Sequence, residues 1–121
     1  MRILGILVLA AYLTSCGQKP VSFHGQIQPI LNNRCISCLC AGQAPDRIVL
    51  TSYDSVMSSN ATQHKKPIVV PGNPSESLLY QVTQSDRLHL RMPPDTAKMF
   101  PIPKDEVVLI GRWIEQGAKN N

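Results

Sequence analysis

The sequence predicts one small all-α domain with three main helices, a short fourth helix, long loops rich in proline and glycine, and at most a minor two-stranded hairpin. In three stretches apolar residues recur at spacings of three and four, the period of a helix with one buried face. Residues that typically begin helices stand at the start of these stretches. Only residues 48–50 and 68–70 form β-prone runs, and prolines bracket the second run.

Residues 1–15 have the pattern of an export signal. Met1 and Arg2 give a positive start, and the apolar run over residues 3–13 is too short to span a bilayer. The run ends in small polar residues, as secretory signals do. We therefore expect these residues to be removed rather than to join the fold.

Cys16 stands where the apolar run ends, and Leu13-Thr14-Ser15-Cys16 resembles a bacterial lipobox. The resemblance implies that Cys16 is acylated and anchors the protein to a membrane; an ordinary signal peptide with an incidental cysteine is the alternative. Gly17 follows, which by resemblance to a Gram-negative sorting rule favours the outer membrane, facing the periplasm, or the cell surface. Residues 16–22 then form a lipidated tether and residues 23–121 the folded domain.

The first helix is predicted to begin at Phe23, with Ser22 as its N-cap. Phe23, Ile27, Ile30 and Leu31 fall on a single apolar face, which we expect to be buried. This helix leads directly to a cluster of cysteines. His24 near its first turn is most simply a surface residue.

The short helix is predicted over residues 53–58, capped by Ser52. A further helix is predicted from Asn73 as N-cap, with Pro74 in the first position and Glu76 in the third, to about residue 84. The β-prone runs at 48–50 and 68–70 could pair with each other.

The last helix is predicted over residues 104–116. Asp105 and Glu106 lie in its first turn, where the helix dipole favours negative charge, and Gly117 fits its C-terminal cap. Its apolar face contains Val107, Ile110, Trp113 and Ile114.

The formal net charge of +4 is mild, and the basic residues are scattered apart from Lys65-Lys66, so we expect no nucleic-acid partner. Beyond Cys16, the cysteines are Cys35, Cys38 and Cys40, all within six residues. A disulfide framework would spread them along the chain, so the cluster indicates a site.

Five segments, in this order, resemble the small monohaem cytochrome c domains of environmental bacteria, including the planctomycete type. The likeness covers residues 23–118. The segments are Phe23-x-x-x-Ile27-Gln28-Pro29-Ile30-Leu31 before Cys35-x-x-Cys38; Leu50-x-Ser52-Tyr53-Asp54; Val70-Pro71-Gly72-Asn73-Pro74-x-x-Ser77-Leu78-Leu79; Arg91-Met92-Pro93-Pro94; and Glu106-x-x-x-Ile110-x-x-Trp113-Ile114-x-x-Gly117-Ala118.

The resemblance implies a cytochrome c-like fold and one haem c, attached covalently through Cys35 and Cys38, with Met92 as an axial iron ligand. A methionine filling a gap in the core is the alternative for Met92. It also implies that Trp113 packs where the first and last helices cross. The function implied is electron transfer to a redox partner protein in the envelope, by a free carrier or a subunit of an oxidoreductase, and not catalysis.

Leu39 occupies the position where the family has its proximal histidine. Three outcomes stay open. Haem attaches and Met92 alone holds the iron; another side chain substitutes; or the domain is degenerate and carries no haem, acting as a structural or interaction lipoprotein. The candidate substitutes are Cys40, His24, His64 and His89.

Two other chemistries remain for the cysteine cluster. Cys35 and Cys38 could form a redox dithiol, although the strand that precedes such a motif in thioredoxin-like folds is missing from the pattern. With Cys40 and a histidine they could hold zinc, although zinc knuckles usually show a second pair of ligands.

Overall fold

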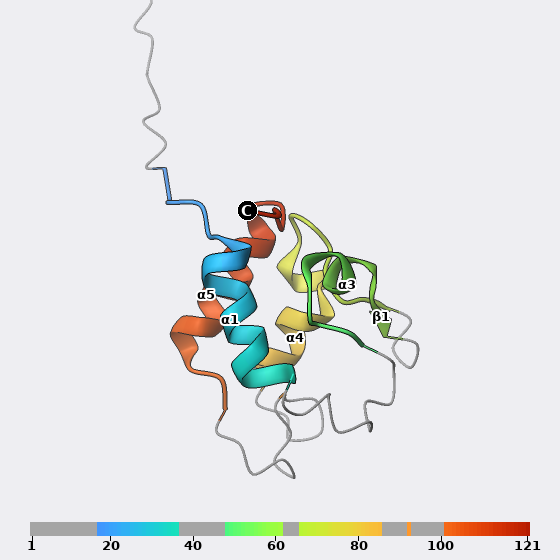
Figure 1. The fold of residues 1–121 in the computed structure, drawn as a ribbon. Coiled ribbons are helices and arrows are strands. Elements are labelled where there is room, and N and C mark those ends of the chain that lie inside the picture. The colour runs from blue at the N-terminus through green and yellow to red at the C-terminus, as the bar shows by residue number, and fades with distance from the viewer. Residues whose placement is uncertain (1–16, 37–47, 62–65, 86–91, 93–100) are drawn as a thin grey trace, which may run out of the picture.

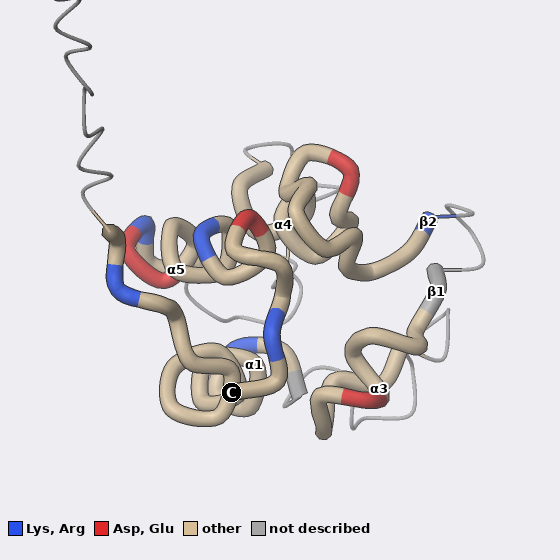
Figure 2. The backbone as a smooth tube through the Cα atoms, turned by 90° about the horizontal axis from the view of Figure 1, so that it is seen from above, with Lys and Arg blue, Asp and Glu red and all other residues tan. Residues whose placement is uncertain are grey.

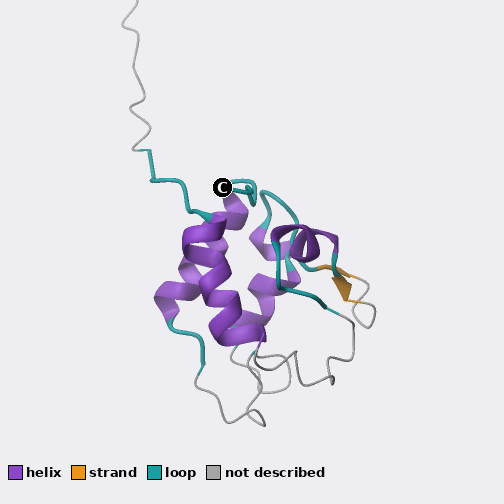
Figure 3. Cartoon of the chain, in the orientation of Figure 1, coloured by secondary structure: helices purple, strands orange, loops and turns teal. Residues whose placement is uncertain are grey.

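The computed structural model describes residues 17–36, 48–61, 66–85, 92 and 101–121, and these are mostly helical, as the all-α prediction requires. Figures 1 and 3 show the helices gathered into one body, with the tether entering at the end where residue 121 lies. Several predicted positions lie outside the described residues: Cys16, Cys38, Leu39, Cys40, His64 and His89.

The first helix is confirmed, and it is wider than a regular α-helix at both ends. A π-helical segment, η1 (Phe23–Ile27), passes into α1 (Gln28–Leu31) and then into a second one, η2 (Asn32–Ile36). Pro29 stands in the first turn of α1 and has no N–H to donate, and Gln28 N–H reaches back five residues to Phe23 O. The Ser22 hydroxyl accepts from Gly25 N–H at 3.0 Å, which confirms the predicted cap.

The predicted apolar face of this helix is the centre of the core. Phe23, Ile27, Ile30 and Leu31 are all at most 7 % exposed. They join a cluster that extends through the chain from Val21 to Ala118. Burial of this face against other elements, rather than helix propensity, holds the wide turns in place.

The last helix, α5 (Lys104–Glu115), packs against the first helix, and Ile110, Trp113 and Ile114 are buried as expected. The rings of Phe23 and Trp113 lie 5.3 Å apart between centroids, so Trp113 does pack where these two helices meet.

Gly117 ends α5, as predicted, in the left-handed region at φ +99°. Gly117 N–H bonds Ile114 O at 3.0 Å and Ala118 N–H bonds Trp113 O at 2.9 Å, the pair of bonds of a Schellman motif.

The helix expected from Asn73 is divided. A 3₁₀ turn, η3 (Pro74–Glu76), comes first, and α4 (Leu78–Gln84) begins after Ser77. Asn73 makes no side-chain cap; the Ser75 hydroxyl donates to its Oδ1 at 2.7 Å instead. Asn73 therefore stands at the predicted N-cap position, before Pro74, but its side chain makes no capping bond because it is engaged within the turn, and the helix it was expected to start is interrupted at Ser77.

Ser77 holds this junction together. Its fully buried hydroxyl accepts from Val70 N–H at 2.8 Å and donates to Asn73 O at 2.9 Å. Ser77→Ala would leave the Val70 amide without its acceptor, so we expect the free energy of unfolding to fall by about 1–3 kcal/mol in urea denaturation. Ser75→Ala, at an exposed position two residues earlier, should change it by less than about 0.5 kcal/mol. Equal losses in the two variants would contradict this role.

Close packing of α4 against α5 depends on Gly111. A Cβ at this position would lie 2.7 Å from Cε2 of Tyr80, on α4. The absence of a side chain lets the tyrosine ring lie directly on the α5 backbone.

The short helix α3 (Tyr53–Ser58) is confirmed, with a capping box between Ser52 and Ser55. Its Val56 is fully buried. Tyr53 packs edge-on against Phe23, with centroids 5.2 Å apart, and donates its hydroxyl to Ala118 O at 2.8 Å. These contacts join α3 to the first helix and to the segment after α5.

A minor antiparallel pair, β1 (Asn60–Ala61) with β2 (Lys66–Pro67), is the only sheet in the described ranges, so the predicted limit of one small hairpin holds. Residues 48–50 and 68–70, which could have paired, do not form a sheet with each other. Ser59 stands between the two runs: Val49 N–H donates to its Oγ at 3.2 Å and Ile68 N–H donates to its carbonyl at 3.3 Å.

Candidate functional site

Cys35 is the one predicted haem-attachment cysteine within the described residues. It lies on η2, next to the last residue of the first helix, and is 9 % exposed as a member of the core cluster. The helix therefore delivers the first thiol of Cys35-x-x-Cys38 at the surface of the apolar core. Cys38 is not described, so the geometry of the pair stays a prediction.

Next to Cys35, Arg34 forms a two-pronged ion pair with Glu106 in the first turn of α5. Its Nε donates to Oε2 at 3.0 Å and its Nη2 to Oε1 at 3.1 Å. The hydrogen bond and charge of Glu106 raise the pKa of Arg34, so its guanidinium stays protonated throughout the neutral range. The pair ties the cysteine-bearing end of the first helix to the start of α5.

This ion pair was not predicted from the sequence, where Glu106 was explained only as a helix start. The two residues are 72 positions apart, and no local pattern marks a contact at that separation. Glu106 both favours the start of α5, because it lies in the first turn, and pairs with Arg34 at the end of the first helix.

Met92 is held by its backbone and exposes its side chain. Its N–H donates to Val82 O at 3.1 Å, and its side chain is 44 % exposed. The carbonyl of Val82 is open to this contact because α4 ends at Gln84, so Val82 belongs to the last turn, whose carbonyls lack helical partners. Met92 is therefore not a core methionine filling a gap.

Cys35 and the Val82 carbonyl that binds Met92 N–H lie on elements that meet at one end of the molecule. The first helix ends there with η2, α4 ends there, and α5 begins there (Figure 1). The Arg34–Glu106 pair fixes two of these three ends to each other, and the Met92 amide is bonded to the third.

His24 lies at the other end of the first helix. Its Nε2 is 2.8 Å from Asn120 Oδ1, and the side chain is exposed. Ten residues, spanning parts of η1, all of α1 and most of η2, separate it from Cys35. His24 is thus a surface residue, as expected, and lies far from Cys35.

No three His, Cys, Asp or Glu side chains come together as a metal site within the described ranges. Because Cys38 and Cys40 lie outside them, the zinc alternative stays a prediction. In the same part of the chain, no helix has the length and apolar character needed to cross a membrane.

Comparison of the chain with family models, curated proteins and solved structures finds no match. The class that the fold defines is a small all-α domain, and its candidate site is defined by this chain's own residues.

Proposed function

We propose that this protein is an electron-transfer haem c protein, with one haem on Cys35 and Cys38 and with Met92 as an axial iron ligand. We further propose that it is exported and held on the outer membrane by lipid on Cys16, and that it passes electrons to a redox partner in the envelope. It is a carrier or a subunit, not an enzyme in its own right.

The observation that carries the haem proposal is the state of Met92. A methionine is costly to leave in water, yet this one is 44 % exposed on a backbone fixed to α4 by the Val82 carbonyl. A fixed backbone with an accessible thioether is what an axial ligand requires. Thioether sulfur favours ferrous iron and so raises the reduction potential.

The described residues supply part of what haem c requires: one cysteine for attachment and one axial ligand. Cys35 supplies one thiol for a thioether bond at the edge of the apolar core, and Met92 supplies a soft axial sulfur. The haem, when bound, supplies one-electron chemistry. The protein's part is to hold the group covalently and to exclude water from it with the apolar core.

Leu39 cannot act as a ligand, so the proposed iron is held by Met92 with its proximal side open or bound by water. Such a site would be high-spin and would bind small ligands. Since His24 lies far from Cys35, the substitutes that remain are Cys40, His64 and His89.

A second candidate is a haem-free domain that acts as a structural or interaction lipoprotein. It is favoured by one observation: Cys35 is 9 % exposed and belongs to the apolar core cluster, which is the environment of an unreactive structural thiol.

A reduced pyridine haemochrome spectrum, with a haem stain on a denaturing gel, separates the two candidates. In cells with a working haem-maturation system we expect covalent haem on the wild-type protein and none on Cys35→Ser/Cys38→Ser. Met92→Ala should keep the covalent haem but change the ligand bands of the ferrous spectrum. Wild-type protein without covalent haem under these conditions would favour the haem-free candidate.

A further inference from the structure

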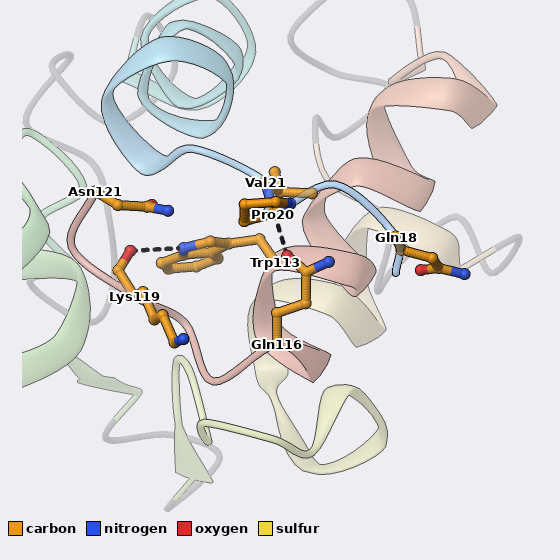
Figure 4. Close-up of a pocket in the computed structure, with 7 residues that line it drawn as sticks. All are labelled: Gln18, Pro20, Val21, Trp113, Gln116, Lys119 and Asn121. Atoms are coloured by element: carbon orange, nitrogen blue, oxygen red, sulfur yellow. Dashed lines mark hydrogen bonds between the residues drawn. The ribbon is translucent and has the colours of Figure 1, made fainter. Parts of the chain in front are cut away.

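A cavity of about 230 Å³ lies at the end of the molecule remote from Cys35, between the tether and the segment that follows α5 (Figure 4). Pro20 and Val21 from the tether and the indole of Trp113 give it apolar walls. Gln116 and Lys119 give it a polar rim. The two ends of the described chain thus build one site together.

The walls of this cavity are fixed by hydrogen bonds. Val21 N–H donates to Gln116 Oε1 at 2.8 Å, and Gln116 Nε2 donates to the carbonyl of Lys19 at 3.3 Å. Trp113 Nε1 donates to the carbonyl of Lys119 at 3.0 Å. The site is therefore formed in advance of any ligand.

Residues 116–121 and 19–24 form what we call the clasp. Asn121 Oδ1 accepts from Phe23 N–H at 2.9 Å, and Asn121 O accepts from His24 N–H at 3.0 Å and from the Ser22 hydroxyl at 2.9 Å. These bonds satisfy amides in the first turn of the first helix, which has no earlier turn to bond them. The clasp holds the tether against the folded body, so the chain leaves the domain at one defined place.

Both parts of the clasp carry a basic side chain. Lys19 and Lys119 are both exposed, and neither has an ion-pair partner in the part of the chain that the structure describes. The lining contains no acidic residue; Glu115 is exposed on α5 and is not part of it. Figure 2 looks down on this end and shows basic positions both on the tether and on the segment after α5.

We propose that the cavity binds the phosphate headgroup of an anionic phospholipid in the membrane on which the protein is anchored. Gln18 lines the cavity and lies two residues after Cys16, so lipid on Cys16 brings a membrane surface to the cavity mouth. Lys119 in the lining suits the phosphate, the rim amide of Gln116 suits the glycerol hydroxyls, and Pro20 suits the start of the acyl chains.

Binding there sets the orientation of the domain. The cavity end faces the membrane, and the end where the first helix and α4 terminate faces the aqueous compartment (Figure 1). A redox partner would then reach the Cys35 end from solution. This inference rests on the anchoring part of the proposed function and not on its haem.

The test is amide hydrogen exchange on the purified, lipidated protein in vesicles of phosphatidylcholine, with or without phosphatidylglycerol. We expect phosphatidylglycerol to slow exchange in residues 17–24 and 112–121 about fivefold, because each lysine near an anionic surface contributes about that factor in affinity. Lys119→Glu should abolish the slowing. Lys66→Glu, at another exposed lysine without a described ion pair, should keep it.

The proposal is overturned if exchange does not depend on phosphatidylglycerol, or if both lysine variants lose the effect equally, since that would be diffuse surface attraction. It is also overturned if inorganic phosphate slows exchange equally in pure phosphatidylcholine, since the site would then bind free phosphate. If mass spectrometry shows Cys16 unmodified, the anchoring part of the proposed function fails. Co-sedimentation of the wild-type protein and of the same two lysine variants with phosphatidylglycerol vesicles then tests whether the cavity binds the lipid. The haem content is measured separately.

Discussion

Leu39→His is expected to give a protein that carries covalent haem at close to one per chain, with iron in a six-coordinate, low-spin state. The histidine would complete Cys35-x-x-Cys38-His, in which the imidazole ligates the iron while the two thiols hold the ring. Met92 would be the opposite ligand: the residue is 44 % exposed and its amide is fixed to Val82 O. Imidazole and thioether together favour low-spin iron with a raised reduction potential.

The measurement is the haemochrome yield per chain together with the absorption spectrum of the ferric and ferrous forms. Leu39→Ala is the matched control, since it also removes the leucine but adds no ligand. Adding Met92→Ala to Leu39→His should keep the covalent haem and return the iron to a high-spin state. No covalent haem on Leu39→His, made with a working maturation system, would contradict both the site and the resemblance on which it depends.

The local parts of the fold could be predicted because their signals are local. Ser22, Ser52 and Gly117 cap the helix ends that the sequence predicts, and the apolar faces of the first and last helices are the buried ones. Side-chain caps and 3.6-residue periodicity act within one or two turns, so they are visible in the sequence itself.

The differences from the predicted fold arose where two local signals competed. At Asn73, the hydroxyl of Ser75 donates to the side chain that was expected to cap the helix, and α4 begins only after Ser77. At Ser59, one hydroxyl and one carbonyl took the bonds that would have joined two β-prone runs. The local propensities for these competing arrangements differ little, so tertiary contacts determine which one forms.

The long-range parts could not be predicted. Arg34 with Glu106 and Phe23 with Asn121 join residues 72 and 98 positions apart, and their partners depend on how the helices pack. In the candidate site, Met92 is the residue whose position depends most on such long-range contacts. The sequence indicates the residue, but its backbone bond to the Val82 carbonyl follows from where α4 ends.

Trp113→Ala should be the most destabilising single substitution in the described core. The side chain is 1 % exposed, packs against Phe23 at 5.3 Å and donates Nε1–H to the carbonyl of Lys119. Truncating a buried tryptophan costs about 3–5 kcal/mol, a large part of the about 5–15 kcal/mol that holds a typical domain together. The loss would also open the clasp, because the indole is the apolar support under residues 116–121.

Urea denaturation followed by far-ultraviolet circular dichroism measures this, since the variant has no tryptophan to report by fluorescence. Val108→Ala is the matched control on the same helix; Val108 is 53 % exposed, so the free energy of unfolding should change by less than about 0.5 kcal/mol. Trp113→Phe keeps a ring against Phe23 but leaves the Lys119 carbonyl without its donor, so it should fall between the two, losing at least about 1 kcal/mol. If Trp113→Ala cost no more than Val108→Ala, the clasp would not depend on the crossing of the first helix with α5. The two chain ends would then be held by the hydrogen bonds of the clasp, from Gln116, Asn120 and Asn121, and those would have to survive in solution without an apolar floor beneath them.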